Sequence, residues 1–230
     1  MALTLIPFAA PTGGAASFGT ALQESDMTKK MILAIAMATP LMIALPAAAD
    51  GDHRAKAIAV IKKDFQPRGQ ASLDRLAEDG LQAVCNRSGN KPPKYIADKM
   101  EADQMAGVKY PADGKLMGDW KEGEKIAQSG RGFTWTDNPG LPVGGNCYNC
   151  HQIAPKETSF GTIGPSLYQF GKLRGNTAEI QKYTYGKIWN AKAFNLCSEM
   201  PRFGHAGALN EKQVKDLVAL LLDPESPVNK

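Results

Sequence analysis

The sequence predicts a mainly α-helical fold, and three observations support this prediction. Apolar residues recur at helical spacing in several segments, and residues that commonly cap helices stand at the starts of some of them. Stretches rich in glycine and proline separate these segments. Strand signals are few.

Five helices are expected along the chain. They cover residues 54–65, a segment capped by Ser72, residues 93–104, residues 119–129 and a last segment capped by Asn210. Pro67 follows the first helix and prevents its continuation. The second helix should bury one apolar face, which contains Leu73, Leu76, Ala77, Leu81 and Val84. Trp120 and Ile126 are the expected apolar anchors of the fourth helix. The expected loops cover residues 107–118 and 130–145.

The last helix has the clearest pattern. Asn210 is its expected N-cap, Gln213 completes a capping box, and Pro224 ends the helix. One apolar stripe contains Val214, Leu217, Val218 and Leu221. A second face carries Ala219, Leu220 and Leu222. These residues mark an interface if they are exposed, whereas the alternative is a helix that is buried on both sides.

The first 49 residues are expected to be upstream residues and a cleaved signal peptide. Residues 28–30 are a short basic region, residues 31–45 form an apolar run, and residues 47–49 are three alanines. The signal is expected to begin at Met27, and the mature chain near Asp50. The apolar run is short for a membrane span, so an uncleaved anchor is the less favoured alternative.

Composition predicts one domain with its own core. The mature chain has about 180 residues, which is enough for such a core. The net charge of +4 is spread along the chain, without the basic block that is typical of nucleic-acid binding. There is also no Ser-His-Asp set, phosphate-binding loop or catalytic carboxylate pair, so no catalytic residue is expected.

The most informative motif is C-x-x-C-H, formed by Cys147, Cys150 and His151. This pattern is typical of covalent attachment of one c-type haem: the two thiols bind the porphyrin, and the imidazole is the proximal iron ligand. The alternatives are a redox disulfide and half of a zinc site. Neither has its usual context, because a βαβ pattern and a second C-x-x-C pair are both absent from the sequence.

The residues that follow resemble the class I cytochrome c family. Residues 161–167 contain a Gly-Pro-x-Leu step, and in that family the proline carbonyl accepts a hydrogen bond from the haem histidine. The resemblance assigns this role to Pro165, although a simple turn proline is the alternative. Met200 is the only methionine after the motif and is the expected second axial ligand. His205, the more remote His53, and a core-filling role for Met200 are the alternatives.

Cys85 and Cys197 are the two remaining cysteines. In an oxidising compartment such a pair usually forms a disulfide, although two separate buried thiols are the alternative. A bridge would fix the chain three residues before Met200 and so protect a weak iron–sulfur bond. A nucleophilic role for either cysteine is the less favoured, enzyme-like interpretation.

A narrower resemblance rests on three stretches, residues 185–195, 197–204 and 217–229. Together with the helical segment before the haem motif, they resemble the SoxX family, the monohaem subunits of SoxAX cytochromes. The resemblance implies a class I cytochrome c fold over residues 119–230, preceded by an N-terminal helical extension over residues 50–118. A periplasmic location is expected from the predicted signal peptide, and c-type haem attachment agrees with export.

This resemblance implies a function in sulfur oxidation. The SoxA-like partner, which holds one or two haems, would join thiosulfate to a cysteine of the SoxYZ carrier. The present chain would accept the electrons and pass them to a small cytochrome c. It would then be the electron-transfer subunit of a heterodimeric L-cysteine S-thiosulfotransferase, without catalysis of its own. The alternative is a free periplasmic electron shuttle, or a subunit of another respiratory complex.

Overall fold

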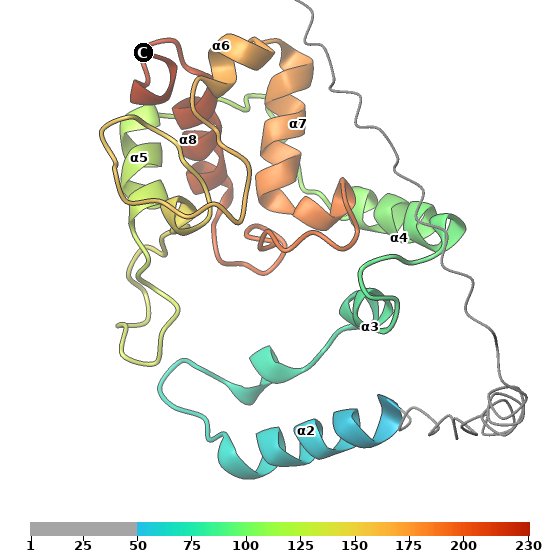
Figure 1. Cartoon of the computed structure of the whole chain (residues 1–230). Coiled ribbons are helices and arrows are strands. Elements are labelled where there is room, and N and C mark those ends of the chain that lie inside the picture. Colours follow the sequence, from blue (N-terminus) through green and yellow to red (C-terminus); the bar gives the residue numbers. More distant parts are fainter. Residues whose placement is uncertain (1–49) are drawn as a thin grey trace, which may run out of the picture. The chain divides into compact units, whose positions relative to one another are not determined.

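The computed structural model describes residues 50–230, with side chains from residue 53 onward. The signal peptide predicted within residues 1–49 lies outside this range. The chain divides into two units after Arg54, and residues 55–230 make up the second. Over the described residues the fold is mainly helical, as predicted, and the only β pairing is an isolated bridge between Arg68 and Ala71 (Figure 1).

The described range contains seven α-helices. They are α2 (Asp50–Asp64), α3 (Gly80–Arg87), α4 (Lys94–Ala106), α5 (Trp120–Gln128), α6 (Phe170–Arg174), α7 (Ala178–Trp189) and α8 (Glu211–Leu222). Short 3₁₀ helices lie between or after them: η1 (Leu73–Leu76), η2 (Cys147–Asn149), η3 (Ala191–Ala193) and η4 (Pro227–Asn229). None of the helices described between residues 50 and 230 is long and apolar enough to cross a membrane.

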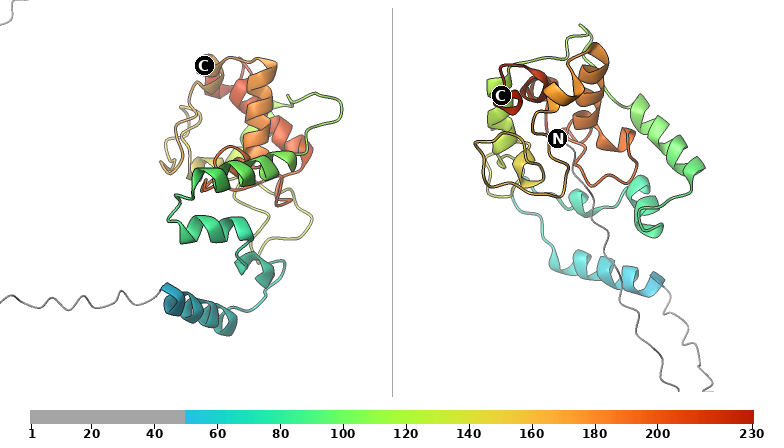
Figure 2. Two further views of the ribbon diagram at one scale, coloured as in Figure 1. Left: turned by 90° about the vertical axis from the view of Figure 1, so that its right-hand side faces the viewer. Right: turned by 45° about the horizontal axis from the view of Figure 1, so that its top comes forward.

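The larger core forms around α8 (Figures 1 and 2). α5 packs closely against α8, and Gly123 makes the approach possible, because a Cβ there would overlap the backbone at Asp216. α6, α7 and η4 also contact α8. Leu220 and Leu222 are therefore almost fully buried. Of the two alternatives for this face, the structure supports burial on both sides, and these residues do not mark an interface.

Capping boxes mark where α3 and α8 begin. The predicted capping box of α8 is confirmed, since Asn210 and Gln213 each accept a backbone hydrogen bond from the other. The helix predicted from Ser72 is wrong. Ser72 is followed only by the 3₁₀ turn η1, and α3 begins separately at Gly80. Asp79 and Gln82 form the capping box there, so a second cap interrupts the apolar pattern.

The expected helix over residues 119–129 corresponds to α5, but its contact face differs from the prediction. Its buried residues are Gly123 and Ala127. Ile126 is partly buried against the larger core, whereas Trp120 is only half-buried and lies outside that cluster. Small residues take the central positions because α5 and α8 approach each other so closely. α7 was not predicted at all.

The segment before residue 119 contributes to two cores. Leu81 and Cys85 of α3 form a small cluster with Leu196. Val108 and Tyr110, which follow α4, join the larger core that surrounds α8. The Tyr185 hydroxyl also donates a hydrogen bond to the Lys109 carbonyl at 3.1 Å. From residue 55 onward, the predicted extension thus belongs to the same compact unit as the residues that carry the C-x-x-C-H motif.

Candidate functional site

The C-x-x-C-H motif forms a single tight turn. Asn146 enters it with a left-handed backbone (φ of 48°), and η2 follows. The amides of Cys150 and His151 both donate to the Cys147 carbonyl, at 3.1 and 2.9 Å. Both thiols and the imidazole therefore lie within one hydrogen-bonded turn. Neither Cys147 nor Cys150 forms a disulfide, so both are free to bind a group.

His151 is buried, and its ring is fixed from two sides. Its Nδ1 lies 2.7 Å from the carbonyl oxygen of Pro165, to which it donates a hydrogen bond. Gly164 lies against the ring itself, because a Cβ at this position would overlap the imidazole. With the proton held on Nδ1, Nε2 is left with the lone pair that a metal ligand needs. The contact predicted for Pro165 is therefore present.

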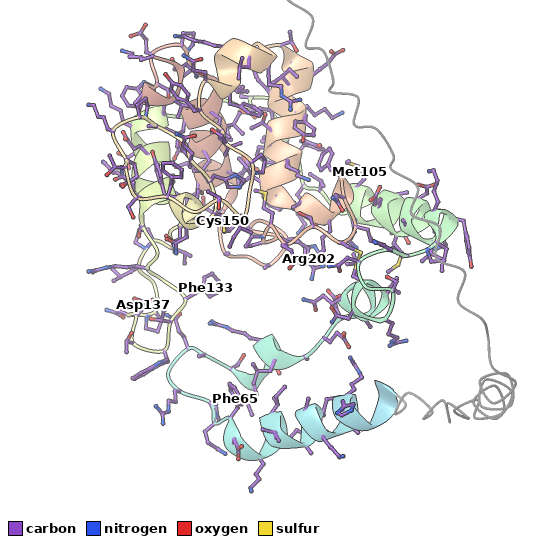
Figure 3. All side chains as sticks on the ribbon, in the orientation of Figure 1. Phe65, Met105, Phe133, Asp137, Cys150 and Arg202 are labelled. Atoms are coloured by element: carbon purple, nitrogen blue, oxygen red, sulfur yellow. A yellow bond between two sulfur atoms is a disulfide. The ribbon has the colours of Figure 1, made fainter. Side chains whose placement is uncertain are left out.

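The loop before the motif is anchored by residues from the N-terminal side of the unit. The Gln70 side-chain amide donates to the carbonyls of Gly132 and Thr134, at 3.1 and 3.0 Å. Arg75 donates to the Phe133 carbonyl and lies over its ring. Asp137, labelled with Phe133 in Figure 3, accepts hydrogen bonds from the amides of Gly132 and Thr134. These contacts fix the chain that enters the motif.

Met200 lies on the loop that joins η3 to α8. Its side chain is partly buried and packs against the larger core, as does that of Cys147. The Met200 amide donates to Ser198 Oγ at 3.2 Å. His205, the rival ligand, is exposed and faces Arg202, with 3.5 Å between Nε2 and the guanidinium. His53 is exposed on α2. The packing thus favours Met200 over the two histidines.

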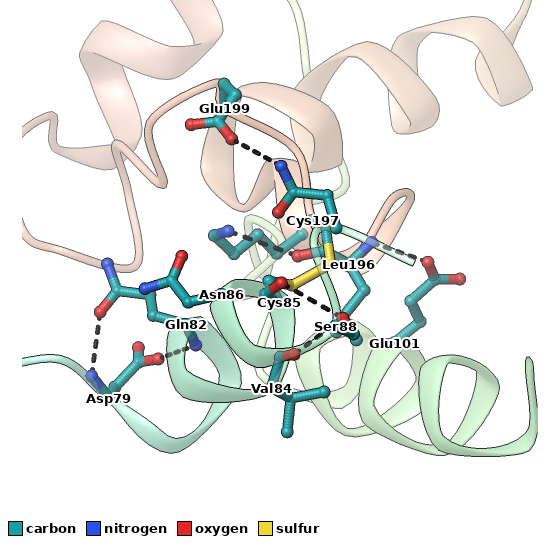
Figure 4. Close-up of a disulfide and its surroundings, with 12 residues drawn as sticks. Asp79, Gln82, Val84, Cys85, Asn86, Ser88, Glu101, Leu196, Cys197 and Glu199 are labelled. Atoms are coloured by element: carbon teal, nitrogen blue, oxygen red, sulfur yellow. Dashed lines mark hydrogen bonds between the residues drawn. A yellow bond between two sulfur atoms is a disulfide. The ribbon is translucent and has the colours of Figure 1, made fainter. Parts of the chain in front are cut away.

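Cys85 and Cys197 form a disulfide, in agreement with the pairing expected from the sequence. The bridge links α3 to the Met200 loop across 112 residues of chain (Figure 4). Beside it, the Leu196 amide donates to Glu101 of α4 at 2.7 Å, and Asn90 approaches Glu199 at 3.5 Å. The loop is therefore held by both α3 and α4 just before Met200.

Loss of contact with water shifts the pKa of several groups near the motif and the Met200 loop. It raises the pKa of the Cys147 thiol to about 12 and that of the Tyr148 phenol to about 12. The Tyr148 hydroxyl is buried and has no hydrogen-bond partner among the described residues. Partial desolvation also lowers the pKa of His205, although its side chain is largely exposed, and the nearby Arg202 lowers it further. His205 is thereby disfavoured as a cation.

No cluster of three or more His, Cys, Asp or Glu within the described residues is arranged to hold a metal ion, as a zinc site would require. A haem iron needs only two axial protein ligands. A cleft of about 260 Å³ lies beside the disulfide, and Gln82, Lys192 and Glu199 are among its lining residues. Neither His151 nor Met200 lines that cleft.

Sequence reasoning missed three residues of this region. Gly164 accommodates the imidazole ring, while Asp79 and Arg202 form an ion pair between α3 and the Met200 loop. Gly164 stands beside Pro165 in a motif that was recognised, so the glycine could have been singled out. The ion pair joins residues 123 positions apart and leaves no local signal in the sequence.

A search against protein-family models gave no match. Among curated proteins, the chain is 32% identical over 210 residues to a protein of Aquifex aeolicus (strain VF5) described as an uncharacterized lipoprotein. The match covers 89% of this chain and all of the relative. This chain belongs to the same family as the Aquifex protein. Members of this family can therefore be expected to share the described fold, since the match spans nearly the whole chain.

Proposed function

We propose that this chain is an exported electron-transfer protein that carries one covalent c-type haem. Cys147 and Cys150 would bind the porphyrin, and His151 and Met200 would be the axial ligands of its iron. The His151–Pro165 hydrogen bond carries the proposal, because it leaves Nε2 as the free donor atom. When bound, the haem supplies reversible one-electron chemistry, and a thioether ligand favours the reduced iron.

A class I cytochrome c fold is part of this proposal. It is supported by the mainly helical fold, the close packing of α5 on α8, and the order of motif, Pro165 and Met200 along the chain. The residues of the chain have simple roles in this scheme. Pro165 and Gly164 orient the imidazole, while the loop around Met200 presents the sulfur from partly buried surroundings.

Export to the periplasm is supported by three observations. The basic and apolar residues before residue 50 have the pattern of a signal peptide. The Aquifex relative is described as a lipoprotein. The chain also contains a disulfide, because Cys85, its first cysteine, is bonded to Cys197. A disulfide is also what an oxidising compartment favours.

The specific function that we propose is that of a SoxX-like subunit. It would accept electrons from a SoxA-like partner during thiosulfate conjugation to the SoxYZ carrier, and then reduce a small cytochrome c. The support is the resemblance of residues 185–195, 197–204 and 217–229. The apolar face with Leu220 and Leu222 gives no support, because it is buried within the chain. The segment before residue 119 also has internal contacts that account for its presence.

Mass measurement after acid–acetone extraction tests the haem proposal. The extracted polypeptide should retain the mass of one haem, because thioether bonds survive a treatment that removes non-covalent haem. The Cys147→Ser and Cys150→Ser double variant should lose it, whereas the Cys85→Ser and Cys197→Ser control should keep it. Release of haem from the wild-type chain by extraction would contradict covalent attachment.

Co-purification and reconstituted turnover test the partner. The tagged chain should elute with a SoxA-like subunit from its native host. The isolated chain should be reducible but inactive with thiosulfate, and adding the partner should restore conjugation to the carrier. If the chain elutes alone, and a SoxA-like protein gains no activity from it, the shuttle alternative is supported instead.

A further inference from the structure

Arg202 lies two residues after Met200, and its side chain links three parts of the chain. The guanidinium is mostly buried and forms an ion pair with Asp79, the N-cap of α3. Its Nη1 lies 3.5 Å from Gln104 Oε1 on α4. Gln104 in turn accepts a hydrogen bond at 3.0 Å from Asn190, a fully buried residue that ends α7. Figure 3 labels Arg202 on this loop.

The Asp79 carboxylate is suited to hold this cation. It also accepts the amide of Gln82, so the capping box fixes its position at the start of α3. Its burial alone would raise the pKa, but the hydrogen bonds from Gln82 and Arg202 and the charge of Arg202 lower it overall. The Asp79–Arg202 ion pair is therefore held in place by α3, and α3 is itself linked to the Met200 loop by the Cys85–Cys197 disulfide.

Together with other contacts, Arg202 ties down the chain on both sides of Met200. Upstream of it, the chain is tied by the Cys197 disulfide and by the Leu196 amide. Downstream, the amides of Gly204 and His205 donate to the Trp189 carbonyl, both at 3.1 Å. Arg202 is the only residue between Met200 and Gly204 for which the structure gives an ion pair, within the described range. A flexible methionine side chain depends on its backbone for a fixed position.

We propose that Arg202, through Asp79 and Gln104, is a positioning residue that holds Met200 at the iron. This inference rests on the proposed function, since it concerns the sixth ligand of the haem. The ion pair prevents the loop from moving outward when the weak iron–sulfur bond breaks. The segment before residue 119 thus acts on the haem through the ligand loop, without contacting the iron.

Imidazole binding to the oxidised holoprotein tests this role, because imidazole competes with Met200 for the sixth position. Two variants remove the ion pair: Arg202→Gln and Asp79→Asn. Asparagine caps helices about as well as aspartate, so the second change should preserve the start of α3. Lys94→Gln is the matched control, because it removes the exposed Lys94–Asp98 pair on α4.

Both variants should bind imidazole about fivefold more tightly than the wild type, which corresponds to about 1 kcal/mol. As imidazole binds, the weak far-red band of methionine-ligated iron should fall in parallel. The imidazole affinity of the double variant should differ little from that of either single variant. Arg202→Lys should restore part of the wild-type behaviour, because it keeps the charge. Lys94→Gln should match the wild type.

The outcomes separate this inference from the proposed function. If the wild type carries covalent haem, and both variants bind imidazole with unchanged affinity, the positioning role of Arg202 is wrong while the haem proposal stands. If the wild type carries no haem at all, the proposed function fails and the inference fails with it. A gain in imidazole affinity equally large in Lys94→Gln would also reject the inference, because it would show a general effect of removing charge.

Discussion

Adjacent residues at positions 164 and 165 act on one imidazole in different ways. Pro165 fixes the proton of His151 with its carbonyl, while Gly164 leaves room for the ring. Proline itself has no amide hydrogen to donate, but its carbonyl accepts normally. The Gly164 amide donates to the Cys150 carbonyl at 2.8 Å, so the same residue also ties the two segments together. The position of the His151 ring therefore depends on two neighbouring residues.

Gly164→Ala should reduce the fraction of chains that carry covalent haem. The new methyl group would overlap the His151 ring and displace it, at a cost of about 1–3 kcal/mol. Mass spectrometry of the purified protein measures the occupied fraction. Gly80→Ala is the control, since no atom lies within 4 Å of a Cβ there. Equal occupancy in the wild type and Gly164→Ala would show that the ring does not need this space.

Met200→Ala should abolish the far-red band of the oxidised protein and lower the reduction potential. The thioether prefers reduced iron, and its loss removes that preference. Absorption spectroscopy and a redox titration measure the two effects. Met105→Ala is a suitable control, because Met105 is also partly buried against the larger core but lies at the end of α4. A band that persists without Met200 would instead indicate His205 or another ligand.

The pH dependence of stability should report the Asp79–Arg202 pair. The folded-state pKa of Asp79 lies below its usual value of 3.8. Its stabilising contribution is therefore full above pH 3.8 and is lost as the pH falls through the lower folded-state value. Because the Asp79 side chain is partly exposed, we expect about 1 kcal/mol or less. Denaturant unfolding of the wild type and Asp79→Asn should give a difference that narrows at acid pH; a difference independent of pH would contradict this.

Among the single helices, a start that is marked by residues close together in the sequence could be predicted, whereas helices without a clear local pattern were missed. The start of α8 was predicted correctly because its capping box lies within four residues. α7 was missed because its buried face contains Tyr185 and Gly186, which give no simple apolar stripe. The helix expected from Ser72 was wrong because Asp79 supplies a second cap, and local sequence alone does not rank the two.

The close contact between α5 and α8 should not tolerate a residue larger than glycine at position 123. Gly123→Ala would place a methyl group against the Asp216 backbone, where no side chain can move aside. We expect a loss of about 1–3 kcal/mol of unfolding free energy, despite the better helix propensity of alanine. Chemical denaturation measures it. Gly80 is the first residue of α3, and a Cβ there meets nothing within 4 Å, so Gly80→Ala should be neutral or slightly stabilising. Equal effects at both positions would contradict the close approach of α5 and α8.

At the scale of the whole fold, contiguous motifs were predictable, whereas long-range contacts other than the disulfide were not. Cys147, Cys150 and His151 stand together in the sequence, so their arrangement as a candidate site needed no fold. The Cys85–Cys197 bridge could be expected only because two cysteines remained unassigned. The hydrogen bond from Leu196 to Glu101 and the pair between Arg202 and Asp79 join distant residues of ordinary type. Only the folded chain reveals these contacts.

Replacing both Cys85 and Cys197 with alanine should destabilise the chain by about 2–5 kcal/mol, because the bridge closes a long loop. Unfolding of this variant should begin locally. The small cluster of Leu81, Cys85 and Leu196 should open first, whereas the larger core around α8 has independent packing. Hydrogen exchange should therefore show faster exchange in α3 than in α8 of the variant.

A reductant supplies the internal control for this prediction. It should lower the denaturation midpoint of the wild type toward that of the double variant and leave the double variant unchanged, because only the wild type has a bridge to reduce. If the two proteins unfold alike under oxidising conditions, the bridge contributes nothing to stability. If exchange rises equally in α3 and α8, the small cluster is not a separate cooperative unit, and the segment before residue 119 unfolds together with the rest of the chain.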